Sequence, residues 1–280
     1  MLIDNYSPFL LKSLVCPISR ESLIGNSMGL LTTSGYLYPG GDFRVVSSLT
    51  QSQDWVKGQL HYENYFKKWT SHSAKFYLEC DAETEFVYKQ LPLLGKVLDV
   101  GGGYGIVAKQ ANVPADNIVC VDPMVCKWAD VPEGCFKDHY SSLASLVRIP
   151  AFAEDLPLQN SSVDTVHMRS CLDHFANPHR ALLEARRVLV PDGQLIIGLA
   201  LEGAFKLNEN SLFNKLKGLI KNSFVGDMYE HFFDSHMFHP TDESLRRLLE
   251  SSGFEVEKWI FQPGYSNVVY VKAIKSIKNI

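Results

Sequence analysis

Short apolar runs alternate with amphipathic stretches over much of the chain. The runs at 96–100, 117–122, 163–168 and 194–199 have the length and continuity of buried strands. Residues 178–190 instead place their apolar positions on one helical face, which predicts an amphipathic helix. Strands that alternate with helices predict an α/β fold built on a doubly wound, mostly parallel sheet.

The C-terminal pattern predicts how this sheet ends. A helix is expected from Thr241 or Asp242, either of which can cap its N-terminus, to Ser252. The runs 254–260 and 266–271 flank a Pro-Gly turn and predict an antiparallel hairpin. The expected sheet therefore has seven strands, mostly parallel, and closes with this hairpin.

Changes in composition and in the pattern of apolar residues divide the chain into three parts. Residues 1–50 contain short apolar runs broken by Gly and Pro, and predict a small β-rich N-terminal appendage. Residues 51–95 are expected to be helical, with a second helix at about 82–91, and to serve as a cap or linker. Residues 96–280 form the main domain, in which an insertion at about 203–238 interrupts the alternation and is expected to act as a lid.

Composition narrows the class of protein. The chain has 280 residues, 46% hydrophobic and 21% charged, which is typical of a soluble globular protein. Its formal net charge is -4 and no basic run stands out, so we expect no nucleic-acid partner. No signal peptide is recognisable and no run reaches the roughly 18 apolar residues of a membrane span. Six cysteines without a C-x-x-C pair indicate reduced thiols, and we expect a cytoplasmic protein.

The chemistry is concentrated at the turn Asp99-Val100-Gly101-Gly102-Gly103-Tyr104-Gly105, which follows the first predicted strand. Glycines let the backbone approach a ligand closely, and the helix behind them offers free N–H groups. However, Gly103–Ala108 also matches the G-x-G-x-x-A form of dinucleotide sites. The turn alone therefore leaves open an NAD(P)-dependent enzyme.

Two carboxylates bear on the choice of ligand. Asp99 precedes the glycines, where its charge can meet an ammonium group but would repel a pyrophosphate. Asp122 ends the second strand, roughly 20 residues further on, where an acidic group accepts both ribose hydroxyls of either ligand. Asp99 thus favours a cofactor with an amino-acid end.

Five segments in order carry a family resemblance. The chain resembles class I methyltransferases that depend on S-adenosylmethionine (SAM), and is most similar to the branch that includes ubiquinone and menaquinone biosynthesis enzymes. The resemblance covers about residues 75–275. The matching segments are Val97–Gly105, Val121-Asp122, Ala153–Leu158, Ser162–Met168 and Arg187–Ile197.

The resemblance implies SAM as the cofactor and a role for each matching position. It places the methionine part at the glycine turn, the ribose at the end of the second strand, the adenine at the Ala-Glu pair and the sulfonium beside the fourth strand. The implied cofactor-binding residues are Asp99, Gly101, Gly103, Gly105, Asp122, Pro123, Ala153, Glu154 and Arg169.

One position departs from the family pattern. The family usually has an acidic residue immediately before the Ala-Glu pair, and here that residue is Phe152. The adenine can instead stack on Phe152, or take its polar contact from Glu154 or Asp155.

The front segment carries a second resemblance. Leu14-Val15-Cys16-Pro17, together with Gly35–Pro39, is similar to the small zinc-ribbon-type domain that precedes some bacterial methyltransferases. Its metal form needs four Cys or His ligands, whereas Cys16 has no second cysteine pair. We predict a metal-free remnant that packs on the main domain or covers the substrate pocket.

Candidates for a catalytic base fall in two segments. A base can take the proton of an oxygen or nitrogen acceptor, and in this fold it commonly follows the fourth strand, where Asp173 and His174 stand. The segment 231–239 adds His231 and His236. Its density of His and Asp raises a metal site as an alternative, but the irregular spacing matches no standard ligand pattern, so no metal is predicted.

The predicted function is methyl transfer from SAM to an oxygen or nitrogen of a small-molecule acceptor. A carbon acceptor would use the same cofactor-binding part of the site. A non-catalytic SAM-fold partner protein remains an alternative. The expected partners exclude nucleic acid and membrane and leave a homodimer open.

A cluster of aromatic residues lies in the expected helical cap. These residues could cover the cofactor or pack in the core: Tyr62, Tyr65, Phe66 and Trp69.

Overall fold

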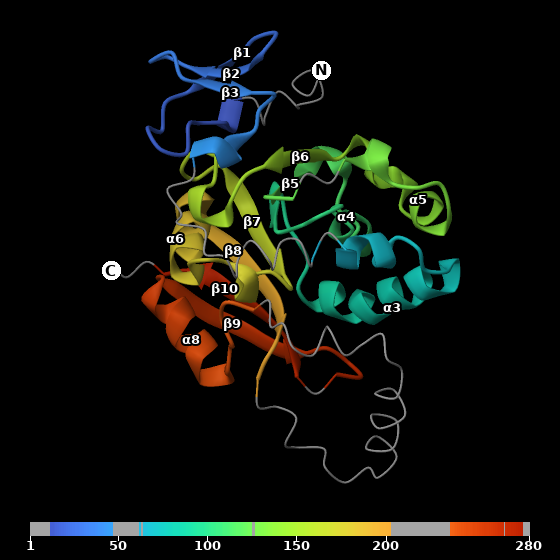
Figure 1. Cartoon of the computed structure of the whole chain (residues 1–280). Helices are drawn as coiled ribbons and strands as arrows, with labels where there is room; N and C mark the ends of the chain where they lie inside the picture. Colours follow the sequence, from blue (N-terminus) through green and yellow to red (C-terminus); the bar gives the residue numbers. More distant parts are fainter. Residues whose placement is uncertain are drawn as a thin grey trace.

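A computed structural model describes residues 12–46, 62, 64–124, 127–202, 236–265 and 267–276. It contains two sheets, a small one near the N-terminus and a large one in the main domain (Figure 1). Most of the expected lid at 203–238, including His231, lies outside the described residues. In the described part, no helix is long and apolar enough to cross a membrane.

The large sheet has seven strands in the order β6-β5-β4-β7-β8-β10-β9. Pairing is parallel from β6 to β8, whereas β10 runs antiparallel to both β8 and β9. This confirms the predicted sheet and its closing hairpin. The strands are β4 (Val97–Val100), β5 (Ile118–Asp122), β6 (Val147–Pro150), β7 (Val163–Arg169), β8 (Leu189–Ala200), β9 (Phe254–Phe261) and β10 (Val268–Lys275).

Three elements differ from the sequence prediction. Strand β6 was not recognised, because an edge strand of four residues is too short to show a period. Strand β8 already begins at Leu189 and passes through the expected turn, where Asp192 has a positive φ of 63°. The helix expected near 82–91 starts earlier, after Ser73, whose side chain accepts from the Phe76 N–H.

Helices cover both faces of the sheet (Figure 1). On one face lie α3 (Ala74–Gln90), α4 (Val107–Gln110) and α5 (Cys135–His139), and their apolar residues share one buried cluster. On the other lie α6 (Pro178–Val188) and α8 (Asp242–Ser251), packed into a second cluster. Thr241 caps α8 through a reciprocal bond with Ser244, as its position predicts.

The small sheet consists of β1 (Leu23–Gly25), β2 (Gly29–Thr32) and β3 (Leu37–Pro39), followed by the 3-10 turn η2 (Phe43–Val46). It is joined to the main domain by backbone pairing, since Val15 N–H donates to the Pro157 carbonyl (3.1 Å). The Cys16 sulfur lies 2.9 Å from the Tyr38 hydroxyl, and both residues belong to the buried apolar cluster into which α6 and α8 pack. The appendage therefore packs on the main domain.

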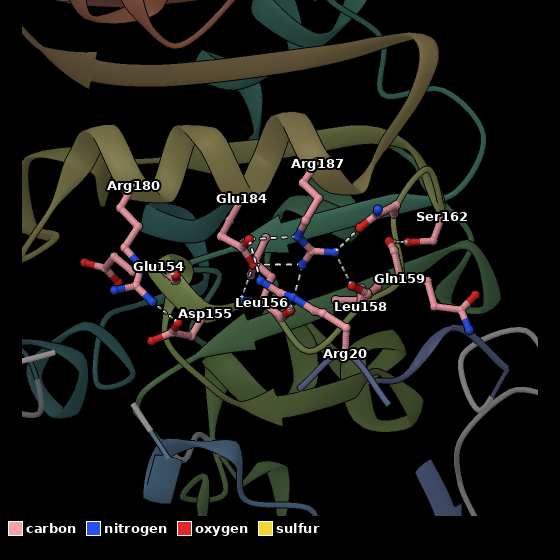
Figure 2. A network of polar contacts seen from close by, with 11 residues as sticks. Arg20, Glu154, Asp155, Leu156, Leu158, Gln159, Ser162, Arg180, Glu184 and Arg187 are labelled. Carbon is pink, nitrogen blue, oxygen red and sulfur yellow. Dashed lines mark hydrogen bonds and ion pairs between the residues drawn. The ribbon is translucent and has the colours of Figure 1, made fainter. Parts of the chain in front are cut away.

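A polar network ties the appendage to α6 (Figure 2). Glu184 of α6 accepts from Arg20 (2.9 Å), from Arg187 (2.7 Å) and from the Leu156 N–H (3.0 Å). Both guanidinium groups also donate to the Leu156 carbonyl. The network thus fixes Leu156, and with it the loop after β6 that contains Ala153 and Glu154, to α6 and the appendage.

Candidate functional site

A cavity of about 260 Å³ opens at the carboxyl ends of β4, β5 and β7. Strand order reverses here, with β5 and β7 on opposite sides of β4, and this is where open α/β sheets bind ligands. The volume is close to the lower end of the roughly 300–1,000 Å³ of small-molecule sites. Of the predicted site residues, those that line it are Asp99, Gly101, Asp122, Pro123, Ala153, Glu154, Arg169 and His174.

The glycine turn shapes one wall of the cavity. Gly101 has a φ of +67°, and a Cβ there would come within 2.5 Å of the Cys171 side chain. Gly105 has a φ of +74°, and a Cβ there would lie 2.1 Å from Leu146. Gly103 and Gly105 do not themselves line the cavity, so their contribution is the left-handed backbone that the turn requires.

Asp122 ends β5 with its carboxylate fixed at the cavity wall. Its Oδ2 accepts from the Gly103 N–H (2.9 Å) and its Oδ1 from the Met124 N–H (2.7 Å). Burial raises its pKa to about 6, although both N–H groups favour the ionised form. The site therefore holds a carboxylate that takes up a proton in mildly acidic solution.

Asp99 is buried and paired with a histidine that the sequence analysis missed. Its Oδ1 lies 2.7 Å from His167 Nδ1, and His167 Nε2 lies 3.1 Å from the Tyr88 hydroxyl. All three side chains are almost inaccessible to solvent. A histidine at a buried position of a central strand needs a hydrogen-bond partner, and His167 in the predicted strand 163–168 was therefore the signal available in the sequence.

The expected adenine side is lined by Phe152, Ala153 and Glu154. Glu154 accepts from the Asn177 N–H (3.1 Å) at the start of α6, and burial raises the pKa of its carboxyl group. Asp155 is ion-paired with Arg180 and does not line the cavity (Figure 2). Both carboxylates thus have partners around α6, and the Phe152 side chain lines the cavity beside them.

The N-terminal appendage reaches the same side of the cavity. Arg44 of η2 donates to the Pro123 carbonyl (2.9 Å), directly after Asp122. Its guanidinium is held in turn by Asp42. Residues of the appendage therefore contact two loops of the site. Arg44 binds the loop after β5, beside the predicted ribose position, and Arg20 binds the loop after β6, beside the predicted adenine position.

Three of the four predicted catalytic residues meet in one cluster, Asp173, His174 and His236. His174 Nε2 lies 2.5 Å from the Tyr62 hydroxyl and 3.7 Å from an Asp173 carboxylate oxygen. His236 Nε2 lies 3.7 Å from Asp173, and its ring stacks on His174 with centroids 4.5 Å apart. Only His174 of these three lines the cavity. His231 is outside the described residues.

The cap aromatics also face the cavity, whose wall includes Tyr62, Tyr65, Phe66 and Trp69. The Phe66 ring closes on the glycine turn, since a Cβ at Gly103 would be 2.8 Å from it. Trp69 packs in addition against Tyr77, Phe136 and Tyr140 of the core. Trp69 therefore both lines the cavity and packs in the core, so the two alternatives left open by the sequence hold together for this residue.

Comparison with known proteins decides the family. A model of the methyltransferase domain matches residues 62–258, which include the whole cavity wall. The chain belongs to the methyltransferase domain family.

Similar proteins agree with this assignment. The ubiquinone/menaquinone biosynthesis C-methyltransferase UbiE of Vibrio cholerae is 28% identical over 170 residues, 57% of this chain and 64% of that protein. The matched region thus spans less than two thirds of that relative's length. The 1,6-didemethyltoxoflavin-N1-methyltransferase of Burkholderia thailandensis, solved with S-adenosylhomocysteine, shares the fold (TM-score 0.52, 13% identity, 90% of this chain and 98% of that one). A SAM-dependent methyltransferase of Thermotoga maritima does so too (TM-score 0.52, 20% identity, 80% and 100%).

SAM is the cofactor of this methyltransferase domain, as the sequence predicted. The residues present are suited to it. A buried carboxylate, Asp99, stands at the predicted methionine position and a partly buried one, Asp122, at the predicted ribose position, and both line the cavity with the crowded glycine turn. The charge of Asp99 would repel a pyrophosphate, so the dinucleotide alternative is set aside.

Proposed function

We propose that this methyltransferase domain transfers a methyl group from SAM to an oxygen or nitrogen atom of a small-molecule acceptor. The carrying observation is that one cavity is lined by both kinds of residue. Its wall contains the carboxylates Asp99 and Asp122 and also the Tyr62–His174 pair. One continuous space thus joins a cofactor site to a candidate base.

When bound, SAM supplies an electrophilic methyl group, so the protein's main task is to position the acceptor in line with it. On this proposal Asp122 accepts the ribose hydroxyls and Phe152 covers the adenine. The cap rings bound the acceptor space and exclude water. Tyr65 and Phe66 form edge-to-face contacts there, which suits a flat, largely apolar molecule.

His174 is the proposed base. Its Nε2 is the ring nitrogen that contacts the Tyr62 hydroxyl, and its side chain lines the cavity. Asp173, 3.7 Å away and buried, would stabilise the positive charge that His174 gains when it takes the acceptor's proton. Asp173 and His236 would then act through His174 and not on the acceptor directly.

A carbon acceptor is a second candidate. The similar proteins carry the name C-methyltransferase, and this similarity is the observation that supports a carbon acceptor. The same base would serve it by taking the proton of a ring hydroxyl, so that electron density moves to the neighbouring ring carbon.

The test combines cofactor binding with turnover. Calorimetry should detect SAM binding to the wild-type protein and its loss in Asp122→Ala. An acceptor screen with methyl-labelled SAM should then yield a labelled product whose bonding by NMR identifies oxygen, nitrogen or carbon. His174→Gln should lower kcat by roughly 10²–10⁴-fold and leave SAM binding unchanged. Binding without any turnover would instead support the non-catalytic alternative.

A further inference from the structure

Two histidines flank the Asp173 carboxylate beside the cavity. His174 Nε2 lies 3.7 Å from Asp173 Oδ1, and His236 Nε2 lies 3.7 Å from Asp173 Oδ2. Both separations are longer than a hydrogen bond, so neither contact is one. One ligand atom from each of the three residues lies within 4.8 Å of the other two. The three side chains thus direct their ligand atoms toward one small space.

The Asp173 carboxylate is buried and has an unsatisfied oxygen. Its side chain is only 9% exposed, and among the residues that the structure describes, Oδ1 has no hydrogen-bond partner. A buried ionised oxygen without a partner is costly, so it calls for a donor or a cation. The same Oδ1 faces His174 Nε2 across the shared space. The unsatisfied oxygen therefore points at the position where an ion would bind.

The donor types and distances fit a divalent transition-metal ion. Zn²⁺ binds imidazole nitrogen and carboxylate oxygen at about 2.0–2.2 Å, so two ligand atoms on a tetrahedral ion are roughly 3.3–3.6 Å apart. Both nitrogen–oxygen separations here are close to that value. The His236 side chain is 45% exposed, so its ring can turn toward His174 and complete the set. Two imidazoles favour such an ion over Mg²⁺ or Ca²⁺, which prefer oxygen ligands.

His174 Nε2 would then have two competing partners. In the proposed reaction this nitrogen takes the acceptor's proton, and a metal ion binds through the same lone pair. The Tyr62 hydroxyl also lies on this nitrogen (2.5 Å), so an ion bound there must displace it. One lone pair cannot hold a metal ion and a proton together. Metal binding and base catalysis by His174 therefore exclude each other.

We propose that Asp173, His174 and His236 bind one divalent transition-metal ion of the Zn²⁺ class, and that this ion inhibits methyl transfer by occupying His174 Nε2. The binding site stands on the geometry alone, whereas the inhibition rests on the proposed function of His174 as a base. The spacing within 231–239 does not reveal this set, because two of the three ligands come from the segment after β7.

Calorimetry with Zn²⁺ tests the site without any need for turnover. The full chain, first treated with a chelator, should bind one Zn²⁺ ion. Asp173→Asn, His174→Gln and His236→Gln should each weaken this binding at least about 100-fold, since even residues that only support metal ligands account for about 10- to 100-fold. The matched control is His179→Gln, which removes an exposed histidine of α6 and should bind Zn²⁺ as the wild type does.

Co²⁺ separates this site from adventitious binding to cysteines. A Co²⁺ ion held by imidazole and carboxylate should show visible absorption bands without the charge-transfer bands that a thiolate ligand adds. These visible bands should disappear in His236→Gln and persist in His179→Gln.

Turnover tests the inhibition. With the product of the acceptor screen as readout, Zn²⁺ should inhibit the wild type at concentrations near its Kd, and a chelator should restore the rate. His236→Gln should need at least about 100-fold more Zn²⁺ for the same fractional inhibition, measured against its own rate in chelator.

Three results would overturn the proposal in whole or in part. If the wild type binds no Zn²⁺, or if none of the three ligand variants weakens the binding, these residues are not a metal site. If Zn²⁺ binds there and turnover is unchanged or rises, the inhibition is wrong. If the chelator-treated protein binds SAM but methylates no acceptor, the proposed function fails and the inhibition falls with it, while Zn²⁺ calorimetry still decides the site.

Discussion

Asp122 should make cofactor binding depend on pH in a defined window. Burial raises its pKa to about 6 in the free protein, so the side chain is mostly protonated at pH 5 and mostly ionised at pH 7. An ionised carboxylate can accept from both ribose hydroxyls, whereas a protonated one has lost an acceptor. Binding therefore favours the ionised form, and affinity should fall as the pH falls through about 6.

The magnitude follows from the pKa. With a pKa of about 6, roughly one molecule in eleven is ionised at pH 5, so the Kd should rise about tenfold between pH 7 and pH 5. The ligand of choice is 5′-methylthioadenosine, because it keeps the ribose and does not reach Asp99 or Arg169 with an amino-acid group. Calorimetry in two buffers of different ionisation enthalpy also counts the proton released at pH 5.

The control is Asp122→Asn, which keeps the shape and cannot titrate. It should bind more weakly at pH 7 and show a flat profile between pH 5 and 7. Glu154 is a second carboxyl group on the cavity wall whose pKa burial raises, but it is bonded to the Asn177 N–H. The reasoning is refuted if Asp122→Asn keeps the wild-type pH profile, or if no proton is released at pH 5.

Three further predictions test the scaffold around the site. Arg44→Ala removes the bond to the Pro123 carbonyl and should weaken S-adenosylhomocysteine binding by roughly 2- to 10-fold in calorimetry, while an unchanged Kd would show that the appendage does not brace this loop. Gly198→Ala would place a Cβ 2.5 Å from the Tyr270 ring and should lower the free energy of unfolding by about 1–3 kcal/mol in urea titrations; no loss would mean that the ring can move aside. Glu184→Gln leaves two guanidinium groups without their counter-charge and should cost about 3 kcal/mol in the same titration, whereas a cost under about 1 kcal/mol would contradict the anchoring role of the network.

The cluster of Asp173, His174 and His236 shows what residue type and chain position can predict and what they cannot. Sequence reasoning selected His174 and Asp173 because they follow the strand that is now β7, and selected His236 from a separate segment dense in histidine. The structure brings all three together, with the His174 and His236 rings stacked. Their meeting depends on how the chain returns after β8, and no local pattern encodes that path.

Glu154 and Asp155 are neighbouring carboxylates that the sequence could not distinguish. Both stood near the expected adenine position, and the sequence left either as a polar contact for the adenine. In the fold, Glu154 lines the cavity and also accepts from the Asn177 N–H at the start of α6, whereas Asp155 is paired with Arg180 and does not line the cavity. A carboxylate near a ligand site and near a helix N-terminus can serve either, and only the placement of α6 decides between them.

The sequence by itself determined the alternation of strands and helices, the glycine turn with its two flanking carboxylates, and the Thr241 cap of α8. These features are local, because backbone period, left-handed glycines and capping bonds act over a few neighbouring residues. Only the tertiary structure decided that His167 contacts Asp99 and that the Arg169 side chain lines the cavity. Strand register sets which side chains meet, and register is fixed by contacts between segments far apart in the chain.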